Sequence, residues 1–111
     1  MGRHMFVVLT APAPGMEDEF NDWYTNQHLS DVLKLEAYKS AQRFRFVPQS
    51  PDDRALRPYM ALYETETDDV AETQRRLREV VATPAMPFVQ AIDRSQSIGW
   101  YYEAITDRRT S

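Results

Sequence analysis

The sequence contains no cysteine, and this absence removes several kinds of chemistry. Without thiols the chain forms no disulfide, offers no thiolate ligand to a metal and has no cysteine nucleophile. It has only three glycines and no glycine-rich phosphate loop, so we expect no nucleotide or flavin cofactor. One usable histidine, His28, and scattered carboxylates make no zinc or iron site, so no metal is expected. Any chemistry is predicted to be cofactor-free.

The sequence also lacks a long apolar run and a cluster of basic residues. No segment is long and apolar enough for a signal peptide or a membrane span, so we expect a cytoplasmic protein with no membrane partner. The net charge is −4 and Lys and Arg do not form a run, which argues against nucleic acid as a partner.

What is present fits one globular domain. The chain has 111 residues, of which 42% are hydrophobic and 27% charged, enough for one core and too few residues for two. We interpret residues 1–4 as a cloning remnant before a natural start at Met5, residues 5–106 as a single domain, and residues 107–111 as a flexible tail.

Apolar periodicity predicts six elements in the order βαββαβ. Strands are predicted for Met5 to Thr10, Tyr38 to Val47, Tyr59 to Thr65 and Ser97 to Ile105, with helices from Met16 onward and from a Thr67 cap to about Ala82. The proline-rich segment Thr83 to Val89 is too apolar to remain exposed to solvent, so we expect it to fold back over the core.

This order predicts an α+β, ferredoxin-like fold, in which a four-stranded antiparallel sheet carries two helices on one face. Three of the strands carry apolar or aromatic side chains at both odd and even positions, and therefore on both faces of the sheet. In the last strand these are Trp100, Tyr101 and Tyr102. The face without helices should therefore also be covered, most simply by a second copy. We predict a homodimer through the sheet faces, a dimeric α+β barrel.

The first helix changes phase near its middle. Phe20, Trp23 and Tyr24 share one side of a helical wheel, yet an unbroken helix would bring Gln27 and Asp31 to that side. Two interpretations are open: the helix breaks between Asn26 and Ser30 and restarts with Ser30 as a cap, or polar residues enter the interior. Both leave His28 near the sheet.

Tyr24, His28 and Asp31 together contain the elements of acid–base chemistry. Histidine titrates near neutrality, and a carboxylate partner can fix its tautomer. The spacing alone favours a structural interpretation, in which His28 only hydrogen-bonds a carbonyl at the helix end and Asp31 opens the next turn.

The segment "EFNDWYTNQHLSDVLKLEAYKSAQRFRF", Glu19 to Phe46, resembles the EthD-like branch of the dimeric α+β barrel proteins, in which a Trp-Tyr pair precedes an "HLPDVL"-like stretch and a strand similar to "SARRF". The sequence departs from this pattern at Ser30, where proline is common. The resemblance implies a pocket between the sheet and the helices, with His28 facing it. It does not specify a reaction, because such relatives include isomerases, lyases, cyclases, cofactor-free oxygenases and accessory proteins.

Further candidates come from the strands and the covering segment. Arg43 is a candidate catalytic residue that could hold a carboxylate or enolate. The candidate substrate-binding residues are Trp23, Tyr59, Tyr63, Met86, Phe88, Trp100 and Tyr102.

We hypothesise a cofactor-free lyase or isomerase that uses His28 on a small aromatic or polyketide-like carbonyl compound in a hydrophobic pocket, with Arg43 or a tyrosine stabilising the oxyanion. The alternatives are a cofactor-independent monooxygenase of aromatic substrates and a noncatalytic dimeric ligand-binding or accessory protein of a degradation pathway.

Overall fold

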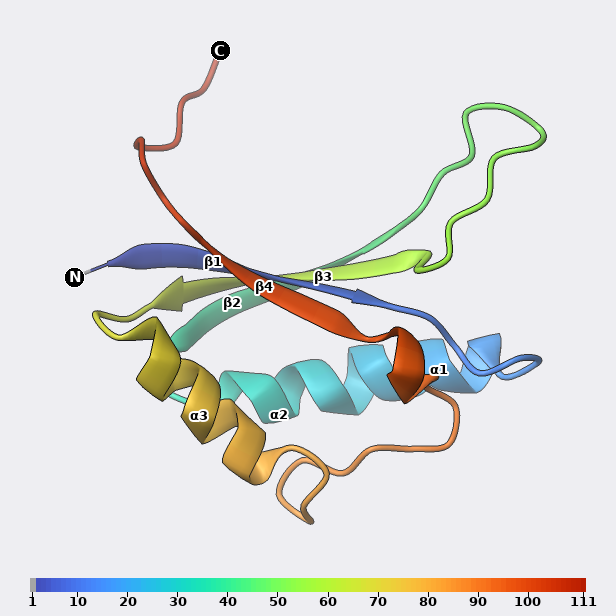
Figure 1. Cartoon of the computed structure of the whole chain (residues 1–111), viewed down its shortest axis with the longest axis horizontal. Coiled ribbons are helices and arrows are strands. Elements are labelled where there is room, and N and C mark those ends of the chain that lie inside the picture. The colour runs from blue at the N-terminus through green and yellow to red at the C-terminus, as the bar shows by residue number, and fades with distance from the viewer. Residues whose placement is uncertain (1) are drawn as a thin grey trace.

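A computed structural model describes residues 2–111 and contains one four-stranded sheet with the helices on one face (Figure 1). The strands are β1 (Arg3–Thr10), β2 (Tyr38–Arg45), β3 (Tyr59–Glu66) and β4 (Ile98–Glu103). Their order is β2-β3-β1-β4 and all neighbours are antiparallel. This is the predicted ferredoxin-like α+β arrangement. The sheet begins at Arg3, so Arg3 and His4 belong to β1.

Alternation along the strands separates the two faces of the sheet. Phe6, Tyr63 and Tyr101 point toward the helices, and the Phe6 and Tyr101 rings stack with centroids 4.2 Å apart. Their neighbours, such as Trp100, point to the other face, above which the loop between β2 and β3 and the C-terminal segment extend in Figure 1. The core therefore lies between the sheet and the helices, and the other face is open.

The first helical segment is continuous and contains a π-helical turn. It runs through α1 (Glu17–Trp23), the π turn η1 (Tyr24–His28) and α2 (Leu29–Leu33), and the Leu29 N–H donates to the Tyr24 carbonyl, five residues earlier. A π turn takes up an extra residue and so shifts every later side chain around the axis. His28 and Val32 are consequently buried, whereas Gln27 is exposed.

Of the two interpretations, the break with a Ser30 cap is therefore wrong, since Ser30 lies inside α2 and no side chain caps that helix. The other interpretation is correct for His28 and Asp31, which do enter the interior. Gln27 stays outside because the phase shift occurs just before it can turn inward.

The second helix, α3 (Val70–Val80), is capped by Asp69, whose carboxylate accepts from the Glu72 N–H. Thr67 is thus not the cap; its hydroxyl instead accepts from the Asp69 N–H. After α3 the chain turns at Ala82, which has a φ of 64°. The covering segment then buries Met86, and a short 3-10 turn, η2 (Arg94–Gln96), precedes β4. No helix within residues 2–111 is long and apolar enough to cross a membrane.

Candidate functional site

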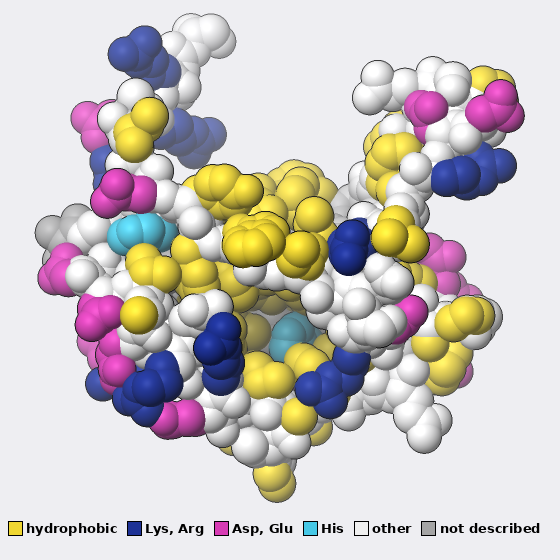
Figure 2. Space-filling model, viewed as in Figure 1, with side chains coloured by type: hydrophobic (Ala, Val, Ile, Leu, Met, Phe, Trp, Pro, Cys, Tyr) yellow, Lys and Arg dark blue, Asp and Glu magenta, His cyan; other side chains and the backbone are white. Residues whose placement is uncertain are grey.

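The largely apolar cavity that we call the central pocket lies between the helix face of the sheet, the π turn and α3. It has a volume of 510 Å³, within the range of pockets for small organic ligands. The side chains of the sheet, both helical segments and the covering segment contribute to it, among them Phe6, Tyr24, His28, Val32, Tyr63, Leu77, Arg78, Met86, Phe88, Arg94 and Gly99. Figure 2 shows a hollow with a histidine at its floor, hydrophobic side chains around it and basic side chains at its rim.

His28 is held in place by aromatic rings. The Trp23 ring stacks on the imidazole at a centroid distance of 4.7 Å, while the rings of Tyr24 and Phe88 meet it edge-on at 4.8 Å and 5.5 Å. The side chain is 8% exposed, and Nδ1 is buried with no hydrogen-bond partner among residues 2–111. Nε2 is therefore the ring nitrogen that can face the pocket.

The aromatic surroundings keep His28 neutral. Burial lowers its pKa from 6.5 to about 4, with the Arg43 charge acting in the same direction and the Asp31 carboxylate opposing it. At neutral pH the imidazole therefore carries no charge and can accept a proton at one nitrogen while donating from the other.

Two tyrosines form a hydroxyl pair beside the histidine. The Tyr24 and Tyr63 oxygens lie 3.3 Å apart, and both residues line the central pocket. Burial raises the pKa of both phenols, which keeps them protonated. Because one hydroxyl donates to the other, the acceptor hydroxyl retains its own proton for a ligand oxygen.

Arg43 lies behind this pair and does not line the pocket. Its guanidinium is 4.6 Å from the centroid of the Tyr24 ring, and it donates to the Asn21 side-chain oxygen and the Thr25 hydroxyl, both at 2.9 Å. The arrangement attracts the cation to the aromatic face and fixes the Tyr24 ring. Arg43 is thus placed to orient Tyr24, and its charge lowers the pKa of that phenol against the effect of burial.

Asp31 is buried one turn after His28 but is not part of the pocket lining. Its Oδ1 lies 3.4 Å from the Lys34 ammonium, while Oδ2 is buried with no hydrogen-bond partner in the described part of the chain. Asp31 and His28 therefore each contain one buried polar atom that lacks a partner, and such atoms are costly unless something pairs with them.

The predicted wall residues divide into three groups. Tyr63, Met86 and Phe88 line the central pocket, whereas Trp23 and Tyr59 are buried beside it and do not line it. Trp100 and Tyr102 are 55% and 59% exposed on the open face, because Tyr101 between them takes the inward position. The sequence did not single out Arg78, Arg94 or Gly99, since nothing in their local pattern distinguishes them from surface residues.

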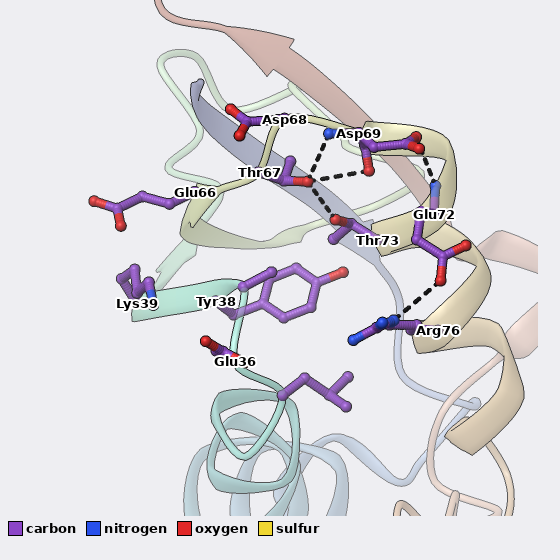
Figure 3. A pocket seen from close by; sticks show the side chains of 12 residues that line it. Glu36, Tyr38, Lys39, Glu66, Thr67, Asp68, Asp69, Glu72, Thr73 and Arg76 are labelled. Atoms are coloured by element: carbon purple, nitrogen blue, oxygen red, sulfur yellow. Dashed lines mark hydrogen bonds and ion pairs between the residues drawn. The ribbon is translucent and has the colours of Figure 1, made fainter. Parts of the chain in front are cut away.

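A second cavity, which we call the edge hollow, lies on the other side of α3 and has a volume of 370 Å³ (Figure 3). Several of its polar side chains bond to one another. The Thr67 hydroxyl accepts from the Thr73 hydroxyl at 2.7 Å, and Glu72 accepts from Arg76 at 3.1 Å. These bonds fix the start of α3, whereas the side chains of Glu36, Lys39 and Glu66, which also line the hollow, form no ion pair or hydrogen bond within residues 2–111. Residues 2–111 contain no group of three or more His, Asp or Glu that could hold a metal ion.

Comparisons with known proteins identify the fold. No protein-family model matches the chain. It is 32% identical over 84 residues to "Core atranone cluster (CAC) protein 1" of Stachybotrys chlorohalonatus (strain IBT 40285); the match covers 76% of this chain and 29% of the length of that relative. Among solved structures, it is similar to an EthD family protein from Bacillus halodurans C-125, with a TM-score of 0.62 and 18% identity, covering 95% of this chain and 100% of the other. The chain therefore has an EthD-like fold.

Proposed function

We propose that the protein is a cofactor-free lyase or isomerase that moves a proton on a small aromatic or polyketide-like carbonyl compound in the central pocket. The observation that carries the proposal is a neutral His28, enclosed by aromatic rings, at the floor of a largely apolar cavity next to the Tyr24–Tyr63 hydroxyl pair. These are the groups needed to remove a proton next to a carbonyl and to stabilise the resulting oxyanion.

The proposed reaction begins with abstraction of the proton α to the carbonyl by His28 Nε2. The electron pair of the C–H bond forms the enolate, whose oxygen accepts a hydrogen bond from the free hydroxyl of the tyrosine pair. In an isomerase, the imidazolium returns the proton at another carbon. In a lyase that eliminates water, the enolate expels a β-hydroxyl group, which takes the proton from the imidazolium. Both routes balance without an electron acceptor.

Asp31 has a supporting role in this scheme. For Nε2 to accept a proton, the proton of neutral His28 must be on Nδ1, which is buried and unpartnered. Pairing of Nδ1–H with the equally unpartnered Oδ2 of Asp31 would satisfy both atoms and stabilise the imidazolium as it forms. We therefore assign Asp31 as a positioning residue rather than a catalytic one.

The comparisons bear on the fold of the proposed enzyme and not on its reaction. The Bacillus protein shares the EthD-like fold in which the central pocket of this chain lies. The name of the Stachybotrys protein assigns it to an atranone cluster and specifies no reaction.

Exchange of α-hydrogens for deuterium tests the proton transfer directly and needs no knowledge of the natural substrate. With 2-tetralone, a neutral aromatic ketone, in D2O, the protein should accelerate exchange measured by NMR. His28→Gln should reduce the enzymatic rate by roughly 100-fold or more, the usual contribution of a general base. His4→Gln is the matched control, because His4 lies in β1 outside the pocket. Binding of the ketone without exchange in the wild type would instead support a noncatalytic ligand-binding protein.

The open face of the sheet also supports a second proposal, a homodimer formed through these faces. Trp100, Tyr102 and Phe44 are exposed there, and Figure 2 shows hydrophobic side chains gathered between the two projecting segments. An exposed patch of this kind favours association with a second copy. Trp100→Lys should shift the protein to a monomer in analytical ultracentrifugation, whereas Val89→Lys, at an exposed apolar residue of the covering segment, should not. A monomeric wild type would contradict this proposal.

A further inference from the structure

Two arginines at the rim of the central pocket have no carboxylate partner. Arg78, from α3, and Arg94, from η2, both line the cavity, and neither forms an ion pair within residues 2–111. Figure 2 shows basic side chains on both sides of the hollow. Both guanidiniums are exposed, and together they place positive charge at the mouth of a largely apolar cavity.

The same helix shows that ion pairing was available to Arg78. Arg75 is paired with both Glu72 and Glu79, and Arg76 with Glu72, all on the side of α3 away from the pocket. Arg78 alone of these three arginines lines the central pocket, and it is the one without a carboxylate. Its charge also lowers the pKa of the Tyr101 phenol against the effect of burial, which places it close to the sheet.

Arg94 is oriented by an aromatic ring. Its guanidinium lies 4.6 Å from the centroid of the Phe88 ring, and Phe88 in turn packs against His28. The neighbouring carboxylate of Asp93 accepts hydrogen bonds from Ser95 instead of pairing with Arg94. A guanidinium that stacks on a ring keeps its N–H groups free in its own plane, which suits the two oxygens of a carboxylate.

We infer that the central pocket selects an organic acid, with a carboxylate held at the mouth by Arg78 and Arg94 while the apolar body of the molecule extends toward His28. The inference rests on the proposed function only for the location of the reacting carbonyl near His28. It adds to that function the charge of the substrate, which the neutral floor of the pocket does not specify.

A matched pair of probes tests the inference by binding alone. 2-Naphthoate and 2-naphthamide have the same apolar body and differ in charge. By isothermal titration calorimetry, the acid should bind the wild-type protein about tenfold or more tightly than the amide, as expected for a charge-assisted contact. The preference should decrease with added salt, because the arginines are at the rim.

Variants locate the source of the preference. Arg78→Gln and Arg94→Gln should each weaken binding of the acid by roughly five- to tenfold and leave the amide within about twofold. Arg76→Gln, on the same helix but lining the edge hollow, is the control and should change neither. Equal affinities for the two probes, equal effects of the three variants, or no binding of either probe would overturn the inference.

The outcome is separable from that of the proposed function. His28→Gln should retain the preference for the acid, since His28 is neutral and does not contact the carboxylate in this arrangement. A protein that prefers the acid but does not catalyse α-hydrogen exchange on 2-tetralone would support the anion site and contradict the acid–base role of His28. Catalysed exchange without a preference for the acid would support the acid–base role of His28 and contradict the anion site.

Discussion

The central pocket and the edge hollow lie on two sides of α3 and differ in how their buried polar groups are satisfied. In the edge hollow, Thr67 and Thr73 bond to each other and Glu72 pairs with Arg76. In the central pocket, His28 Nδ1 has no partner and Arg78 has no carboxylate within residues 2–111. Because a buried polar atom without a partner costs stability, we interpret the cavity that contains the enclosed imidazole as the ligand site and the bonds beside the edge hollow as structural.

The largest expected effect concerns the pH dependence of stability. The His28 pKa is about 4 in the folded protein and near 6.5 in the unfolded chain, so between these values the unfolded chain binds a proton that the folded one does not. The contribution of His28 to the free energy of unfolding is therefore fully present above pH 6.5. It decreases as the pH falls toward 4, by roughly 3 kcal/mol.

Urea denaturation of the wild type and His28→Gln at pH 7 and pH 4.5 measures this contribution. Carboxylates titrate in both proteins, so the difference between the two losses isolates the histidine. Equal losses would show that His28 is not buried as a neutral group.

The next effect is on the rate of α-hydrogen exchange, and it compares one tyrosine from each cavity. Tyr63→Phe removes one hydroxyl of the pair in the central pocket and should slow catalysed α-hydrogen exchange about 100-fold, the usual cost of losing an oxyanion donor. Tyr38→Phe is the matched control. Tyr38 lines the edge hollow and bonds to Tyr101 at 2.6 Å, so its loss should leave the exchange rate almost unchanged. Similar rate losses in both variants would remove the distinction between the cavities.

Gly99 tests how tightly the wall of the central pocket is packed. A Cβ atom at this position would lie 2.8 Å from Cε1 of Phe6, whose ring is stacked on Tyr101. Gly99→Ala should therefore destabilise the protein by about 2 kcal/mol, as expected for overpacking. Ser97→Ala, which also alters the lining, adds no atoms and should be nearly neutral. Thermal denaturation measures both, and a neutral Gly99→Ala would mean that Phe6 can move aside.

The smallest effect belongs to the edge hollow. Thr67→Ala removes a hydroxyl that accepts from the Asp69 N–H at 3.0 Å and from the Thr73 hydroxyl at 2.7 Å. Stability should fall by about 1 kcal/mol, while exchange of 2-tetralone should be unaffected. A large loss of exchange activity would show that the edge hollow contributes to function.

The sequence predicted the βαββαβ order of elements along the chain, because period-two and helical patterns are local and strong, and from that order an antiparallel sheet with both helices on one face. It also detected that the first helix changes phase at Gln27 and His28, but not that a π turn accommodates the change. The i to i−5 hydrogen bond of that turn leaves no residue signature, and only packing against the sheet selects it over a break.

The side-chain directions in β4 were beyond the sequence for a related reason. Trp100, Tyr101 and Tyr102 are all aromatic, so their pattern does not say which one faces the helices. Pairing of β4 with β1 settles the question, since it places Tyr101 opposite Phe6. Likewise, Arg78 resembles Arg75 and Arg76 in sequence, and only the fold separates the arginine at the pocket from the two that are ion-paired on the helix surface.

The most direct test of the central claim is an NMR titration of the His28 ring with and without 2-tetralone. His4, in the same spectrum, serves as the internal reference. A neutral imidazole that opens into the ligand pocket predicts a His28 pKa of about 4 and ring signals that shift when the ketone binds. A His28 pKa near 6.5, with ring signals that do not respond to the ketone, would contradict it.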